Sequence, residues 1–142
     1  MVEEEIRLER EAVLAQLASA YQRRDLDEFE KAVRLDMTLT LAGSSRLAGT
    51  YEGYAAFGRY LEILRESMRS AGQAITFEHD QDQMVFRQVM IVSGGTQSVE
   101  MTLVVTVRYD EGGKIESFLV KPENQALFDR VIDAGRAQVE PE

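Results

Sequence analysis

Few side chains in this chain of 142 residues have the chemistry of a proton-transfer catalyst. His79 is the only histidine, and strand alternation places it on the same apolar, inward face as Ile75 and Phe77. A histidine in that position can act as an acid or base near neutral pH. It can equally be a core or rim histidine that one hydrogen bond satisfies, so both interpretations stay open.

Two further polar side chains are candidate catalytic residues. Tyr21 lies near the end of a predicted helix, where its hydroxyl can point into a cavity or stay in water while the ring is buried. Arg87 interrupts an apolar strand: facing inward it would bind an anionic group or need a counter-charge, for which Glu100 and Glu116 are candidates. Facing outward, it would be an ordinary surface or interface arginine.

The composition argues against several classes of function. The chain has no cysteine, so it has no disulfide or thiolate site, and with a single histidine we predict neither a metal site nor a cofactor. The net charge of -9 argues against binding nucleic acid or an anionic membrane. The acidic start is no signal peptide and no apolar run reaches the ~18 residues of a membrane span, so we expect a cytoplasmic protein.

Two helices are predicted before the first strand, over residues 3–24 and 23–35. Apolar residues recur along each at steps of three or four, and Asp25 with Glu28 forms a capping box at the second start. The predicted buried positions are Ile6, Val13, Leu17, Tyr21, Leu26, Phe29, Ala32 and Val33.

A strand over residues 36–43 and a long helix should follow. The strand alternates apolar residues with threonines, while Gly49 and Gly53 permit a turn and a close start to the helix, which Gly72 ends. The predicted buried positions are Met37, Leu39, Leu41, Phe57, Tyr60, Leu61, Leu64 and Met68.

The second half of the chain predicts an antiparallel meander and a final helix. The strands cover residues 74–80, 83–93, 98–110 and 114–122, and glycine-rich hairpin turns precede the last two. A helix over residues 123–135 buries Leu127, Phe128, Val131 and Ile132. The order predicts one α+β domain over residues 1–138 with a polar tail at 139–142, in which a curved antiparallel sheet wraps around a long helix and encloses a conical cavity.

Three stretches carry a resemblance to a known family: "YQRRDLDEFEKAVRLDMTL", "LAGTYEGYAAFGRYL" and "VVTVRYDEGGKIESFLV". In this order they resemble the nuclear-transport-factor-like superfamily, within it the SnoaL-like polyketide cyclase and ketosteroid isomerase branch. The resemblance implies a cone-shaped, cystatin-like α+β barrel. It does not fix the function, because the family includes isomerases, cyclases, epoxide hydrolases, dehydratases and non-catalytic binding modules.

The resemblance can be tested at the positions where the isomerases carry their catalytic groups. It implies a tyrosine at Leu17, a general-base aspartate at Leu41 and a proton-donating acid at Val105, and all three are apolar here. Enolisation needs a base and an acid, so steroid isomerase activity is not expected. The aspartate–arginine arrangement of the epoxide hydrolases is also incomplete, because Val89 stands two residues after Arg87.

Two hypotheses follow. The first is a SnoaL-like enzyme that binds a small, largely apolar organic molecule and transfers protons through Tyr21, His79 and Arg87, as in cyclisation, isomerisation or hydration. The habits of the family favour it. The second is a non-catalytic binding or assembly module, which the loss of the isomerase positions favours. In either case the predicted cavity residues are Leu17, Leu41, Phe57, Tyr60, Leu61, Met101, Val105 and Phe118.

The resemblance also implies a partner. Members of the family often pair through the outer face of the sheet, which here carries Thr102, Val104 and Thr106 and is only mildly polar. We therefore expect a homodimer.

Overall fold

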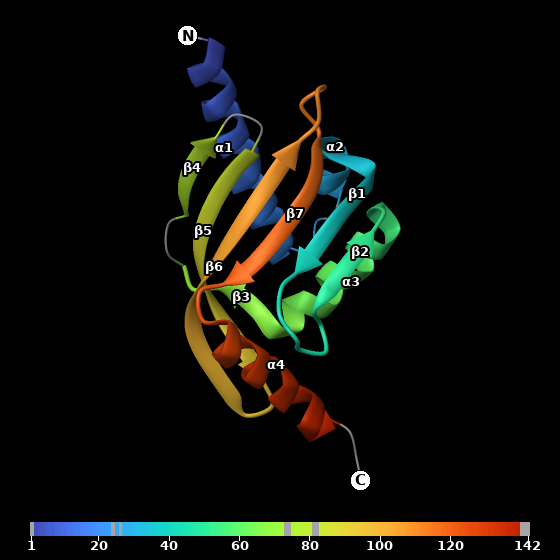
Figure 1. The fold of residues 1–142 in the computed structure, drawn as a ribbon, viewed down its shortest axis with the longest axis vertical. Helices are drawn as coiled ribbons and strands as arrows, with labels where there is room; N and C mark the ends of the chain where they lie inside the picture. Colours follow the sequence, from blue (N-terminus) through green and yellow to red (C-terminus); the bar gives the residue numbers. More distant parts are fainter. Residues whose placement is uncertain (1, 24, 26, 73–74, 81–82, 140–142) are drawn as a thin grey trace.

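A computed structural model describes residues 2–23, 25, 27–72, 75–80 and 83–139, arranged as helices around one curved sheet (Figure 1). The α+β class predicted from the sequence is confirmed. Leu26 and residues 140–142 of the predicted tail lie outside the described residues. The helices are α1 (Val2–Arg23), α2 (Asp27–Ala32), α3 (Tyr54–Ser67) and α4 (Gln125–Val139). The strands are β1 (Val33–Leu41), β2 (Gly49–Glu52), β3 (Met68–Ser70), β4 (Thr76–Asp80), β5 (Gln83–Gly94), β6 (Gln97–Tyr109) and β7 (Ile115–Pro122).

The sheet is mostly antiparallel, in the order β2-β1-β7-β6-β5-β3, and β4 also pairs with β5. β3 and β4 follow one another along the same edge of β5, since Ser70 pairs with Met90 and Thr76 with Arg87. The prediction of an antiparallel sheet is wrong for one pair, because β1 and β7 run parallel. These strands are connected through the rest of the sheet rather than by a hairpin, which permits the parallel arrangement.

The inward face of the sheet follows the predicted alternation. In β1, Met37, Leu39 and Leu41 are buried, and in β6 the buried residues recur at every second position. These side chains and the apolar stripes of α1, α2 and α3 form one core. The buried β6 positions are Met101, Leu103, Val105, Val107 and Tyr109.

Two short strands were not predicted. Residues 49–52 form β2, a hairpin partner of β1, rather than a turn, and only Gly53, with a φ of 89°, makes the sharp change of direction into α3. The helix ends at Ser67 rather than near Gly72, and Met68, predicted on the helix, begins β3. Both strands have four residues or fewer, which is too short for an alternation to stand out.

One predicted core position of α1 is wrong. Ile6 is 40% exposed and Leu8 is 53% exposed, because the first turns of α1 project past the end of the sheet (Figure 1). Leu14 and Ala20 are buried instead. Among the described helices, none combines the length and the apolarity that crossing a bilayer requires.

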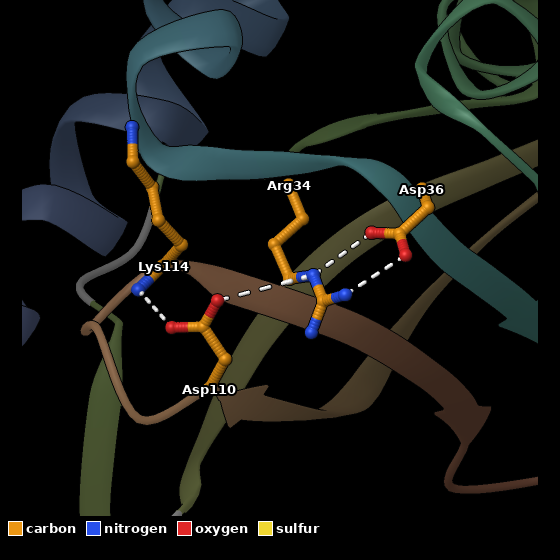
Figure 2. Close-up of polar contacts among 4 residues, drawn as sticks. All are labelled: Arg34, Asp36, Asp110 and Lys114. Carbon is orange, nitrogen blue, oxygen red and sulfur yellow. Dashed lines mark hydrogen bonds and ion pairs between the residues drawn. The ribbon is translucent and has the colours of Figure 1, made fainter.

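A charged cluster fixes the start of β1 beside the β6–β7 turn (Figure 2). The β1–β7 register is irregular between Val33 and Thr38, and there Arg34 donates two hydrogen bonds of 2.8 Å to Asp36. These bonds and the positive charge lower the pKa of Asp36. Arg34 also lies 3.9 Å from Asp110, whose carboxylate accepts the Lys114 backbone N–H at 2.9 Å.

The last helix packs away from α1, beside the turn end of the β5–β6 hairpin (Figure 1). Phe128, Val131 and Ile132 are buried, as predicted. The carboxylate of Asp129 accepts the Ser44 backbone N–H at 3.1 Å, and Gln125 donates to the carbonyl of Ala42 at 3.0 Å. The helix is thus tied to the β1–β2 loop.

Gly43 provides a test of this contact. It has a φ of 113°, and a Cβ there would collide with the side-chain ends of Gln125 and Asp129, which can move only by losing their hydrogen bonds to the loop. We expect Gly43→Ala to lower the free energy of unfolding by about 2–4 kcal/mol, measured by denaturant titration. Gly113→Ala is the control, because Gly113 also has a positive φ but has open space around it, and should cost about 1–2 kcal/mol. Equal losses would show that the α4 contact contributes nothing.

Candidate functional site: an apolar cavity

A cavity of about 120 Å³ lies between the helices and the inward face of the sheet. Its walls come from α1, α2, α3 and five strands, so segments far apart in the sequence meet there. The lining residues are Leu14, Leu17, Ala18, Tyr21, Phe29, Leu39, Phe57, Leu61, Leu64, Met68, Phe86, Gln88, Met90, Leu103, Val105, Phe118 and Val120.

Three aromatic rings form one side of the cavity. The rings of Phe57 and Phe118 are stacked, with centroids 5.8 Å apart and an interplanar angle of 9°. Phe29 packs against Phe57 at 5.3 Å in a tilted arrangement. These rings pack on one another and give this part of the cavity wall an aromatic character.

The mouth of the cavity lies between α1 and β5. Most lining side chains are buried, whereas Ala18 and Tyr21 of α1 and Phe86 and Gln88 of β5 are half-buried. A ligand would therefore pass between these two elements.

Tyr21 and Gln88 are the only polar side chains among the lining residues, and none of the lining residues is charged. The Tyr21 hydroxyl donates to the Met68 carbonyl at 3.0 Å, where α3 gives way to β3. Arg65 of α3 donates to the backbone carbonyl of Tyr21 at 2.8 Å. Two hydrogen bonds thus join the end of α1 to α3 and its junction with β3.

Burial raises the pKa of Tyr21. The phenol is therefore protonated at neutral pH and can donate a hydrogen bond, but it cannot serve as a base there. Tyr21 is the only lining residue with an ionisable side chain.

The structure brings some of the predicted cavity residues together and leaves others elsewhere. Leu17, Phe57, Leu61, Val105 and Phe118 line the cavity, and their contact with a ligand stays a prediction. The other three are buried outside it: Leu41 in β1, Met101 opposite Met90 in β6, and Tyr60 where its hydroxyl donates to the Leu47 carbonyl.

Of the three predicted catalytic residues, only Tyr21 lines the cavity. His79 lies outside it, half-buried, with Nδ1 3.0 Å from the sulfur of Met84. Arg87 is on the outer face of β5, where it donates to the exposed carboxylate of Glu78 at 2.6 Å. Its partner is thus neither Glu100 nor Glu116, and the outward interpretation of Arg87 is confirmed.

The cavity occupies the region where the isomerases are expected to carry their acid and base. Leu17 and Val105 line it, while the β1 residue that faces it is Leu39 rather than Leu41. All of these positions are apolar. Within the part of the chain that the structure describes, no cluster of three or more histidine, cysteine or acidic residues could hold a metal ion.

Gln88 is the lining residue that sequence reasoning missed most plainly. It belongs to the inward set of β5, between Phe86 and Met90. The outward set, which includes Val85 and Val89, is equally apolar, so the sequence pattern does not show which set of β5 residues faces the cavity. The pairing with β6 shows it, because Gln88 lies opposite Leu103, an inward residue of a strand with clear alternation.

Four of the five tyrosines should titrate late in the folded protein. Burial raises the pKa of Tyr21, Tyr54 and Tyr60, and that of Tyr109 to about 12. In the unfolded chain these phenols lose their protons near pH ~10, so above that pH the folded state holds more protons and the free energy of unfolding falls as pH rises. Tyrosinate absorbance followed together with circular dichroism should show these groups ionising only as the fold is lost.

Two controls accompany this titration. The denatured protein should release all its tyrosine protons near pH ~10. Tyr109→Phe should lessen the alkaline loss with little change at neutral pH, because the buried Tyr109 hydroxyl has no hydrogen-bond partner among the residues that the structure describes. Full tyrosine ionisation near pH 10 in a folded sample would contradict the prediction.

No protein-family profile and no curated protein sequence matches the chain. Solved structures do. An NTF2-like protein from Burkholderia xenovorans superposes with a TM-score of 0.74 at 18% identity, covering 85% of this chain and 93% of that one. TerC, co-crystallised with polyporic acid, gives 0.71 at 16% identity, covering 86% and 96%. A candidate polyketide cyclase from Xanthomonas campestris gives 0.67 at 13% identity, covering 89% and 98%. The chain therefore has the cone-shaped α+β fold of the NTF2-like proteins, which its sequence motifs imply.

Proposed function

We propose that this protein binds a small, mostly apolar organic molecule in the cavity between α1 and β5. The observation that carries the proposal is a cavity of about 120 Å³ whose walls are apolar except for Tyr21 and Gln88. An engineered apolar cavity of about 150 Å³ in another protein takes up benzene, so a ligand of about one ring fits this volume.

Proteins of the same fold support the proposal. One of the neighbours was crystallised with an organic acid, and another is named as a candidate polyketide cyclase. These neighbours support the interpretation of the chain as a SnoaL-like protein that binds a ligand in its cone.

Binding without turnover is the function that this geometry supports best. Proton-transfer chemistry needs a base as well as an acid. Of the three polar residues predicted for that role, Tyr21 alone lines the cavity, and its raised pKa keeps it protonated, so it cannot serve as the base. A catalytic role would therefore need a base carried by the substrate itself.

Toluene is a suitable first probe, since it is apolar and has one ring. We expect the melting temperature of the wild type to rise with toluene concentration, because binding to the folded state stabilises it by RT ln(1 + c/Kd), where c is the free toluene concentration. Ala18→Leu should abolish this effect, because Ala18 is at the mouth and the larger side chain enters the cavity. Ala15→Leu is the matched control, because Ala15 lies on the exposed face of the same helix.

Two results would contradict the proposal. One is a wild type that neither toluene nor any other single-ring compound stabilises. The other is equal stabilisation of the Ala18→Leu and Ala15→Leu variants, which would locate binding outside the cavity.

We also propose that two copies pair through the outer face of the sheet. Half-buried apolar side chains gather there, on strands at the centre of the sheet, and such a row favours association. Its members are Val85, Val89, Ile91, Val104 and Leu119.

Sedimentation equilibrium at micromolar concentration tests the pairing. The wild type should sediment as a dimer, and Val104→Lys, in the middle of the face, should give the monomer mass. Gln97→Lys adds the same charge at the exposed hairpin turn and should leave the dimer intact. A monomeric wild type would overturn the proposal.

A further inference from the structure

We infer that the cavity selects an uncharged ring compound with one hydrogen-bonding group, and that the Gln88 side chain recognises this group. The inference rests on the proposed binding function and adds the chemical class of the ligand. It follows from the position of Gln88, from its free hydrogen-bonding capacity and from the absence of charge around it.

Gln88 is held in the cavity wall by the pairing of β5 with β6. It lies opposite Leu103 of β6, and its neighbours at i−2 and i+2, Phe86 and Met90, line the cavity with it. It is half-buried at the mouth. As a lining residue at the mouth, Gln88 lies where a ligand would enter, and we infer that its amide contacts the ligand once it is bound.

The Gln88 side chain makes no hydrogen bond to any part of the chain that the structure describes. Its amide offers two N–H donors and a carbonyl acceptor. A ligand group that fills this capacity gains affinity, because a polar group buried beside apolar atoms without a partner is costly. An apolar ligand that covers the amide would leave it unsatisfied.

Tyr21 also favours a ligand that carries a hydrogen-bonding group. Its proton is committed to the Met68 carbonyl at 3.0 Å, so toward the cavity its oxygen can only accept a hydrogen bond. A ligand hydroxyl can therefore accept from the Gln88 amide and donate to the Tyr21 oxygen or the Gln88 carbonyl. A neutral hydroxyl or carbonyl satisfies these groups, and a carboxylate does so only by bringing its charge inside.

A charged ligand has no counter-charge in the cavity. None of the lining side chains is charged, and the Arg87 guanidinium nearby in sequence points outward to Glu78. Moving a carboxylate from water into such walls carries a desolvation cost that the two polar groups do not offset. The site should therefore reject benzoate while it accepts phenol.

Calorimetric titration with toluene, phenol and benzoate tests the inference on the wild type, Gln88→Leu and Gln83→Leu. Leucine has a similar size but no amide, and Gln83, on the same strand, does not line the cavity. We expect the phenol-to-toluene affinity ratio to fall about 5- to 10-fold in Gln88→Leu and to stay unchanged in Gln83→Leu. Benzoate should bind the wild type at least about 10-fold more weakly than phenol.

The outcomes separate this inference from the proposed function. If toluene and phenol both fail to bind the wild type, the proposed function itself fails. If toluene binds but the ratio is the same in Gln88→Leu as in the wild type, Gln88 does not recognise the ligand and the inference is overturned. Benzoate binding as tightly as phenol would overturn the uncharged class. Gln88→Met replaces Gln88→Leu if the leucine variant does not fold.

Discussion

The alternation of side chains along the paired strands is the constraint on which this structure depends. Once β6 directs Leu103 and Val105 inward, its pairing with β5 and β7 fixes the direction of every neighbouring side chain. Gln88 must then face inward and Arg87 outward. One residue of register therefore decides whether an amide or a guanidinium lies on the cavity side of β5.

The same constraint keeps the cavity apolar. The curved sheet is stable because its inward face is apolar and packs on α1 and α3, and the cavity is the part of that face the helices leave uncovered. Tyr21 lies at the boundary: its ring belongs to the wall and its hydroxyl bonds the Met68 carbonyl. This hydrogen bond ties the end of α1 to Met68. It also uses the only proton of the Tyr21 hydroxyl, so at the mouth of the cavity the hydroxyl can act only as an acceptor.

Much of the fold could be predicted from the sequence, because long amphipathic elements leave a clear period. The buried residues of β1 and the buried face of α3 are as predicted. The prediction was wrong where a residue fits the helical spacing but belongs to a strand. Met68 continues the spacing of α3 although it begins β3. The prediction also failed in β5, where both faces are apolar. His79 shows a third reason for failure. Alternation can predict that a side chain faces inward, but it cannot predict whether the cavity extends to that end of the strand.

The apolar lining of the cavity has a consequence for how chemistry could arise on this scaffold. Val105 is buried in the wall, so a carboxylate substituted there would be desolvated and would hold its proton well above the usual pH range of an aspartate. It would then stand ready to act as a general acid or base near neutrality. A protein of this architecture is thus separated from an acid–base catalyst by very few substitutions, because buried apolar walls already supply the pKa shift that a catalytic carboxylate needs.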